Sequence, residues 1–292
     1  MFVRLSRTAA AACCLFAVTA PAFAAEQDFT EALDKGVAVW TDPDGSTPSP
    51  ERARAEAEYV LGKATFTLYH EFGHAMIDDY KIGWIVQEEA IADAFAGIYM
   101  PASEANEARD SLAIGGIRAF MDRGTRMAEN DDIDYADSHL TDHQRGFSAA
   151  CLMVALSAER FGALAEEIAL PASRRDYCGA ERNQVAEAWL KLIGPANYLD
   201  EGQTSKNRIT VSYDDPNPEL KRVADILKAS GLMEAIAKEI ETTFQLPFPI
   251  LLRAQNCDQP NEFWFPDDHE IGFCYNYLDY YQSLGLSVRF TD

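Results

Sequence analysis

The chain has 292 residues, of which 48% are hydrophobic and 25% charged, a composition typical of a globular protein with a sizeable core. Disordered chains, collagen-like fibres and disulfide-dense mini-proteins are thereby excluded. With 25 Lys and Arg against 47 Asp and Glu, the net charge is −22, and so acidic a chain repels phosphate backbones, which argues against nucleic acid as a partner.

The first 24 residues have the layout of a secretory signal peptide. Arg4 and Arg7 precede an apolar run at residues 8–20, and Ala22-Phe23-Ala24 is a small-x-small cleavage site. An uncleaved anchor is the alternative, but the apolar run is shorter than the roughly 20 residues that a membrane-spanning helix needs. We expect cleavage after Ala24, a periplasmic or secreted mature chain, and no membrane span after cleavage.

The mature chain, residues 25–292, is predicted to form a single α+β domain. Loop and turn residues dominate up to Pro50. Helices are expected in the part at 25–200, at about 51–79, 86–100, 104–122, 143–165 and 181–194, with an acidic, irregular stretch at 124–142.

The part at 205–285 contains strands. Alternating patterns are found at 208–213, 248–254, 261–265 and 270–274. Further helices are expected at 217–243, with a break at Ser230-Gly231, and at 275–284. We therefore predict a mostly helical core with a small antiparallel sheet from the C-terminal third, in which the last two strands form a hairpin.

The strongest functional motif is His70-Glu71-Phe72-Gly73-His74 on the long helix expected at 51–79. Residues i and i+4 share a helix face, so both imidazoles can reach one metal ion. This is the HExxH arrangement of zinc hydrolases, in which zinc lowers the pKa of its water to about 7. We expect one Zn²⁺ per chain with His70 and His74 as ligands and Glu71 as the general base.

The third ligand is predicted on the following helix. No histidine stands six residues after His74, whereas Glu89 and Asp93 are again four residues apart. This spacing matches the Glu-zincin plan, in which the glutamate ligates zinc and the aspartate accepts a hydrogen bond from a ligating histidine. Glu88 or a more distant residue is the alternative ligand, and two amphipathic helices with solvated acids are the alternative without a metal.

A second pair of histidines, His139 and His143, is also four residues apart. A second metal site and a polar loop are two interpretations. The third, which we favour, is that His139 or Arg145 stabilises the oxyanion of a tetrahedral intermediate. The acidic stretch at 129–134 lacks the glycine and terminal glutamate of an EF-hand, so a solvated loop is expected there rather than a calcium site.

Four cysteines follow the predicted signal peptide, and an even number in an exported chain indicates two disulfides. Of the three possible pairings we favour the sequence-local one, Cys151–Cys178 and Cys257–Cys274, because each pair brackets a short run of chain. Four unpaired, buried thiols are the alternative.

Several motifs together resemble a family of bacterial zinc metallopeptidases that carries a domain-of-unknown-function designation. They are 68–78, 88–96, Asp137 to Cys151, Leu170 to Cys178, 260–264 and 271–275, and they span about 60–190 and 205–285. The resemblance implies zinc and a peptidase-like site. It also implies that the two halves stand in swapped order, because the strand-containing part precedes HExxH in the family; Leu199 to Asn207 would be the new join.

Three residues depart from the family pattern: Glu262 and Trp264 replace its Ala and Tyr, and His143 stands where an acid is usual. All catalytic residue types are nevertheless present. We therefore expect a secreted zinc metallopeptidase that acts on a peptide or protein substrate. The alternative is a catalytically inactive, zinc-containing periplasmic protein that binds a partner on the same scaffold.

Overall fold

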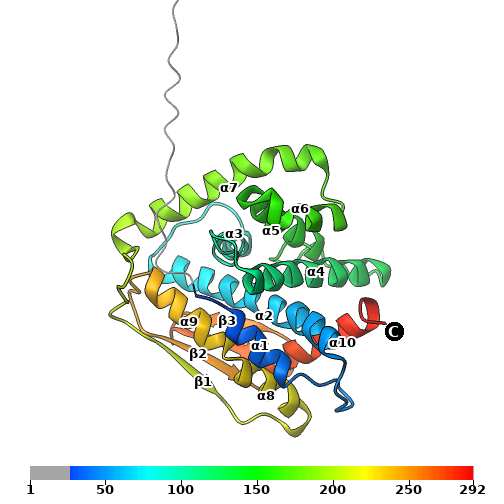
Figure 1. The fold of residues 1–292 in the computed structure, drawn as a ribbon. Helices are drawn as coiled ribbons and strands as arrows, with labels where there is room; N and C mark the ends of the chain where they lie inside the picture. Colours follow the sequence, from blue (N-terminus) through cyan, green and yellow to red (C-terminus); the bar gives the residue numbers. More distant parts are fainter. Residues whose placement is uncertain (1–26, 292) are drawn as a thin grey trace, which may run out of the picture.

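One long helix, α2 (Pro50–Asp79), lies at the centre of the fold (Figure 1). The structure is a computed structural model that describes residues 27–291. The predicted signal peptide lies outside the described residues. Ser49 caps α2 by accepting a hydrogen bond from the backbone N–H of Arg52, and Pro50 fits the first turn. Most of α2 is buried on every side, which is typical of a central core helix.

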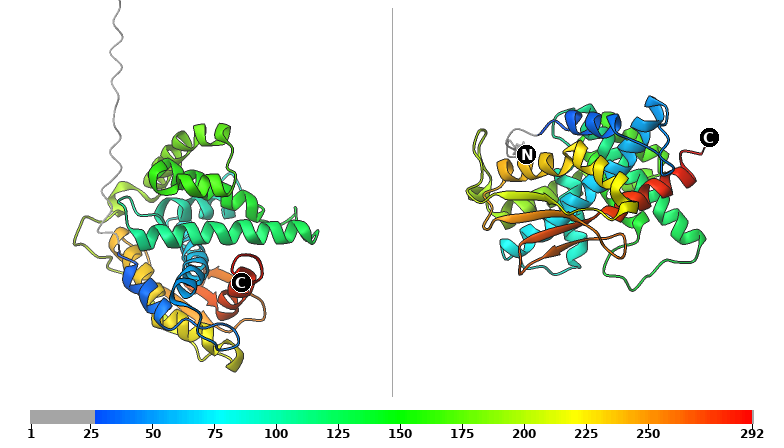
Figure 2. Two further views of the ribbon diagram at one scale, coloured as in Figure 1. Left: turned by 45° about the vertical axis from the view of Figure 1, so that its right-hand side comes forward. Right: turned by 90° about the horizontal axis from the view of Figure 1, so that it is seen from below.

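The other helices of the first part pack on α2 or on its neighbours. They are α3 (Glu88–Tyr99), α4 (Glu107–Glu129), α5 (Asp142–Leu156), α6 (Ala158–Glu167) and α7 (Ala172–Ile193). Helices α3 and α4 contact α2 directly, while α5 packs on α3, α4 and α7. In Figure 1 and in the left view of Figure 2, α4 and α7 lie above α2.

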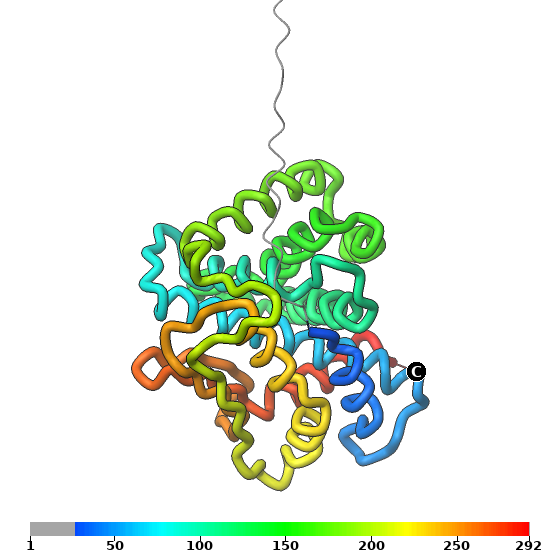
Figure 3. Tube along the Cα trace, turned by 60° about the vertical axis from the view of Figure 1, so that its left-hand side comes forward, coloured from blue at the N-terminus to red at the C-terminus, as the bar shows by residue number. Residues whose placement is uncertain are grey.

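Most of the second part lies below α4 in the same views. It comprises β1 (Ile209–Tyr213), α8 (Lys221–Ser230), α9 (Leu232–Thr243), β2 (Ile250–Gln255), β3 (Glu262–Phe265), β4 (Glu270–Cys274) and α10 (Tyr275–Val288), with the short helices η1 (Pro195–Asn197) and η2 (Pro218–Leu220). Helix α1 (Thr30–Ala38) packs on α8 and α2. The connection from α7 into β1 runs along the outside of the molecule (Figure 3).

The α+β class is confirmed, but the prediction of an antiparallel sheet is wrong for two of its strand pairings. The strand order is β1-β2-β4-β3; β1 pairs with β2 and β2 with β4 in parallel, and only β3 and β4 are antiparallel. Alternation of apolar residues indicates a half-buried strand but not its direction. Helices α8 and α9 form the crossover that a parallel pairing of β1 with β2 requires. The predicted hairpin is present as β3 and β4.

Several predicted helix boundaries also differ from the structure. Helix α1 lies in a stretch predicted to be loop, and α4 continues into the stretch predicted to be irregular. The single helix expected at 143–165 is divided into α5 and α6 at Ser157, whose hydroxyl accepts a hydrogen bond from the backbone N–H of Arg160. An N-cap residue inside a helical pattern therefore marks the start of a new helix.

Helices α2 and α4 cross with their backbones in contact. A β-carbon added to Gly115 would overlap the carbonyl oxygen of Glu58, and one added to Gly62 would overlap that of Leu112. Glycine is required at such a crossing because any side chain would force the two helices apart.

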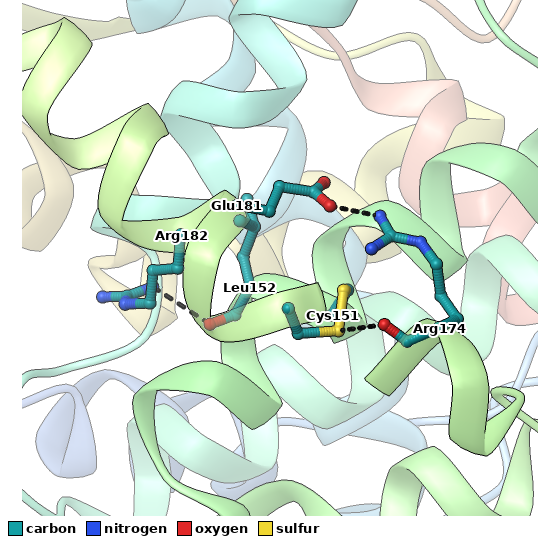
Figure 4. The surroundings of a disulfide bond; sticks show 6 residues. Cys151, Leu152, Arg174, Glu181 and Arg182 are labelled. Carbon is teal, nitrogen blue, oxygen red and sulfur yellow. Dashed lines mark hydrogen bonds and ion pairs between the residues drawn. A yellow bond between two sulfur atoms is a disulfide. The ribbon is translucent and has the colours of Figure 1, made fainter. Parts of the chain in front are cut away.

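Both predicted disulfides are present. Cys151–Cys178 links α5 to α7, and beside it Arg182 donates a hydrogen bond to the carbonyl oxygen of Leu152 at 3.2 Å (Figure 4). Cys257–Cys274 joins the end of β4 to the loop after β2. The chain-entropy model gives each closure about 3–4 kcal/mol of stability.

The start of the loop that precedes α2 lies against α10 and α8. The carbonyl oxygen of Thr41 accepts hydrogen bonds from the side chains of Gln282 on α10, at 3.0 Å, and of Arg222 on α8, at 3.2 Å.

One cluster of buried apolar residues extends from Phe29 to Leu284 and includes both parts of the chain. This continuity supports the single-domain organisation, which stays a prediction. Among residues 27–291, no helix combines the length and apolarity needed to cross a bilayer.

Candidate metal centre

Three side chains from α2 and α3 converge on one point. His70 and His74 lie one turn apart on α2, with their Nε2 atoms 3.1 Å from each other. Glu89, in the first turn of α3, brings its Oε2 to 3.1 Å from Nε2 of His70 and 3.2 Å from Nε2 of His74. Gly73 allows this approach, because a β-carbon there would lie only 2.9 Å from the backbone of Ala92 on α3.

Carboxylates hold both imidazoles in one orientation. Nδ1 of His70 lies 2.8 Å from Oδ1 of Asp93, and Nδ1 of His74 lies 2.8 Å from Oε1 of Glu88. An ionised carboxylate only accepts hydrogen bonds, so each Nδ1 carries a proton, and in the neutral ring each Nε2 then presents a lone pair. This pairing is the usual arrangement behind metal-ligating histidines.

The donor set fits one metal ion. Two imidazole nitrogens and a carboxylate oxygen face one another at 3.1–3.2 Å, and with both rings neutral none of them supplies a proton to the others. In a tetrahedral zinc site with bonds of about 2.0–2.1 Å, ligand atoms are about 3.3–3.4 Å apart. A single cation therefore satisfies all three groups with small shifts, and the structure brings the three predicted ligands together.

Asp93 is itself held by Arg145. The guanidinium Nε and Nη2 donate to the two carboxylate oxygens at 2.9 and 2.7 Å. Burial alone would raise the pKa of Asp93, but the charge of Arg145 and the hydrogen bond from His70 hold that pKa well below its usual range. Arg145 thus keeps Asp93 ionised as an acceptor for His70. The predicted contact of Arg145 with an oxyanion stays a prediction.

Glu71 lines a pocket of about 440 Å³ beside these ligands. Its side chain is buried, and its Oε1 lies 3.9 Å from Nε2 of His70. The pocket is also lined by residues of α4, of the segment between α4 and α5, of β3 and of α10. A carboxylate so close to the ligand atoms, with open space in front of it, is placed as a general base should be.

Two residues that line the pocket are not among the functional candidates predicted from the sequence. Lys63 is two turns before His70 on α2; its ammonium donates to Oγ1 of Thr67 at 3.0 Å and lies 3.8 Å from the ring centre of Phe120. Burial lowers the pKa of Lys63 to about 7. Its spacing of seven residues from His70 was the signal that could have placed it on the ligand face.

The second missed residue is Glu262, at the start of β3. Burial raises the pKa of its carboxyl well above the usual range, although Lys63 opposes this shift. Its Oε1 is buried and has no hydrogen-bond partner within residues 27–291. In the sequence Glu262 was only a departure from the family pattern, and nothing local connects it with α2.

His139 and His143 have separate partners. Nε2 of His139 lies 2.8 Å from Oε2 of Glu89, whereas Nε2 of His143 lies 3.2 Å from the hydroxyl of Thr125. Ligand atoms of His70, Glu89 and His139 also lie within 4.8 Å of one another. The two histidines of this pair therefore have different surroundings, and the solvated loop expected at 129–134 stays a prediction.

An α+β fold with an HExxH helix and a converging glutamate defines the class of a candidate metallohydrolase. The chain belongs to a family described as "Putative metallopeptidase", whose model matches residues 41–193 and 213–292. The resemblance seen in the sequence is thereby confirmed. The unmatched residues 194–212 include the predicted join, but the order of the halves stays a prediction. No curated protein and no solved structure gives a significant match.

Loss of Asp93 should weaken metal binding without removing a ligand. In Asp93→Ala, His70 loses the acceptor that fixes its orientation, so the affinity for Zn²⁺ should fall by about 10–100-fold. Asp110→Ala is the matched control, because it breaks a comparable pair with Arg160 that touches no histidine. Competition titrations with a chelator measure both variants, and equal affinities would show that Asp93 does not act on the site.

Proposed function

We propose that this chain is a secreted or periplasmic zinc-dependent peptidase of the Glu-zincin type. The observation that carries the proposal is the convergence of His70, His74 and Glu89 beside Glu71, whose buried carboxylate lines a pocket together with His70. Two imidazole nitrogens and one carboxylate oxygen form the donor set of catalytic zinc sites, whereas magnesium and calcium prefer oxygen ligands alone. Two disulfides fit an oxidising compartment outside the cytoplasm.

Zinc held by these residues would act as a Lewis acid and lower the pKa of water to about 7. Glu71 would accept the proton of the attacking water and later deliver it to the leaving nitrogen. Asp93 and Glu88 keep the imidazoles oriented, and Arg145 keeps Asp93 in place. The substrate would be a peptide or protein whose scissile carbonyl enters the pocket between α2 and β3.

An oxyanion role for His139 has a definite requirement. Its Nδ1 lies 3.1 Å from Oδ1 of Asp137, so the neutral imidazole carries its proton there and has a lone pair on Nε2. Only the doubly protonated ring could donate from Nε2 to a developing oxyanion. Arg145, whose Nε and Nη2 each donate one hydrogen bond to Asp93, would have the N–H groups of Nη1 and the second N–H of Nη2 for that purpose.

The test is metal analysis of the purified mature protein together with digestion of a broad peptide library. We expect one zinc per chain, cleavage products, loss of cleavage after treatment with 1,10-phenanthroline, and recovery when Zn²⁺ is restored. Cleavage that persists after complete metal removal would contradict the proposal.

One observation favours a second candidate, a zinc protein that binds a partner without catalysis. His139 lies against Glu89 on the exposed side of the ligands, where a substrate carbonyl would have to approach. Zinc-loaded protein that cleaves no member of the library would support this candidate over the peptidase.

A further inference from the structure

Three imidazoles, rather than two, surround one oxygen atom. Oε2 of Glu89 lies 3.1 Å from Nε2 of His70, 3.2 Å from Nε2 of His74 and 2.8 Å from Nε2 of His139. The first two histidines belong to the HExxH helix, while the third comes from the irregular segment between α4 and α5. The ring of His139 lies over that of His70, with centroids 5.8 Å apart and planes inclined by 27°.

His139 is oriented in the same way as the two helix histidines. Its Nδ1 faces Oδ1 of Asp137 at 3.1 Å, as those of His70 and His74 face Asp93 and Glu88. The same Asp137 oxygen accepts the backbone N–H of His139 at 2.8 Å, which fixes the turn that carries the ring. In their neutral form, all three imidazoles would therefore present their Nε2 lone pairs to Glu89, as ligands of a cation do.

We propose that His139 is a fourth protein ligand of the resting zinc centre and that it leaves the metal when substrate arrives. Ligand atoms of His70, Glu89 and His139 lie within 4.8 Å of one another, a spacing at which they could hold one metal ion, and Nε2 of His74 lies 3.1 Å from that of His70. Zinc with four protein ligands has no open position, whereas catalytic zinc keeps one. The position taken by His139 is therefore the one that a substrate carbonyl or water needs.

His139 is the ligand that can leave at the lowest cost. Its side chain is 37% exposed, against 3% for His70 and 12% for His74. The two helix histidines are fixed by the buried backbone of α2, whereas His139 depends on a short turn held by Asp137. Release of one exposed ring from a loop leaves the other three ligands undisturbed. The exchange with substrate rests on the proposed peptidase function. The number of side chains that bind zinc can be measured whether or not the protein cleaves peptides.

X-ray absorption spectroscopy at the zinc edge counts imidazole ligands without any assay of activity. Zinc-loaded mature protein should show three imidazoles, and His139→Ala should show two. His143→Ala is the matched control, since it removes a histidine four residues away that contacts Thr125, and it should keep three. His139→Ala should also weaken zinc binding by about 10–100-fold, at least as much as the loss of a residue that only orients a ligand.

Acetohydroxamate, which binds zinc through two oxygens, tests the exchange. Saturating acetohydroxamate should lower the imidazole count of the wild type from three to two and leave that of His139→Ala at two. If the wild type shows two imidazole ligands and His139→Ala also shows two, the proposal is wrong. If the wild type keeps three imidazole ligands in the presence of acetohydroxamate, His139 does not exchange. Because the counts need no substrate, they stand even if the library shows no cleavage.

Discussion

Replacing Glu71 with Gln should lower kcat for a cleaved peptide by about 10²–10⁴-fold and leave one zinc bound. The amide has the shape of the carboxylate but cannot accept the proton of the attacking water. Glu71 lies near the ligand atoms, with its Oε1 3.9 Å from Nε2 of His70, and the zinc ligands proposed here do not include it. The measurement is steady-state kinetics on the best library peptide, together with the metal content of the same preparation.

Glu51→Gln is the control for this substitution, because Glu51 is exposed in the first turn of the same helix. It should leave both kcat and the zinc content at the wild-type values. Unchanged kcat in Glu71→Gln would rule out the general-base role, and loss of zinc would show that Glu71 helps to hold the metal.

Gly115→Ala should lower the free energy of unfolding by more than about 3 kcal/mol, the upper end of the range for overpacked cores. The new methyl group would overlap the carbonyl oxygen of Glu58, and neither backbone can yield without separating α2 from α4. Urea denaturation followed by circular dichroism gives the difference.

Gly162→Ala provides the matched comparison. Gly162 lies within α6, and a β-carbon there meets nothing within 4 Å. Alanine at this position should stabilise the protein by about 0.5–1 kcal/mol through helix propensity. Equal unfolding free energies for Gly115→Ala and the wild type would mean that the α2–α4 crossing relaxes more easily than close-packed backbones allow.

The predicted ligands could be found in the sequence because their geometry is local. His70 and His74 share a helix face by spacing alone, and the same rule places Asp93 behind Glu89. The convergence of α2 and α3 needed only a short connection between them. Glu88 was weighed as a ligand, but the structure shows it holding Nδ1 of His74, a distinction that depends on side-chain direction rather than on spacing.

The features that could not be predicted depend on contacts between distant parts of the chain. Glu262 reaches the pocket through the position of β3 beside α2, and no local pattern contains that information. Likewise, the pairing of β1 with β2 was not predictable because alternation is the same in parallel and antiparallel strands. His139 was singled out, but its partner Glu89 could not be known until the loop was placed.

The contact of Thr41 with Gln282 bears on the predicted swap of the two halves. If the strand-containing half came first in an ancestral chain, its end would have to meet the start of the helical half. In the structure, Thr41, near the start of the helical half, accepts a hydrogen bond from Gln282, in the last helix of the other half. Rejoining the chain in that order is therefore geometrically feasible, as circular permutation requires.

The position of α10 also determines when the pocket can be completed during synthesis. All proposed metal ligands have been made once residue 139 is reached, but Tyr277, whose hydroxyl lies 2.7 Å from that of Thr67, follows 210 residues after its partner. Contacts of such long range form slowly, because a large loop must close first. Until then the pocket lacks the wall that α10 supplies. A nascent chain thus carries its proposed ligands long before the pocket beside them is complete.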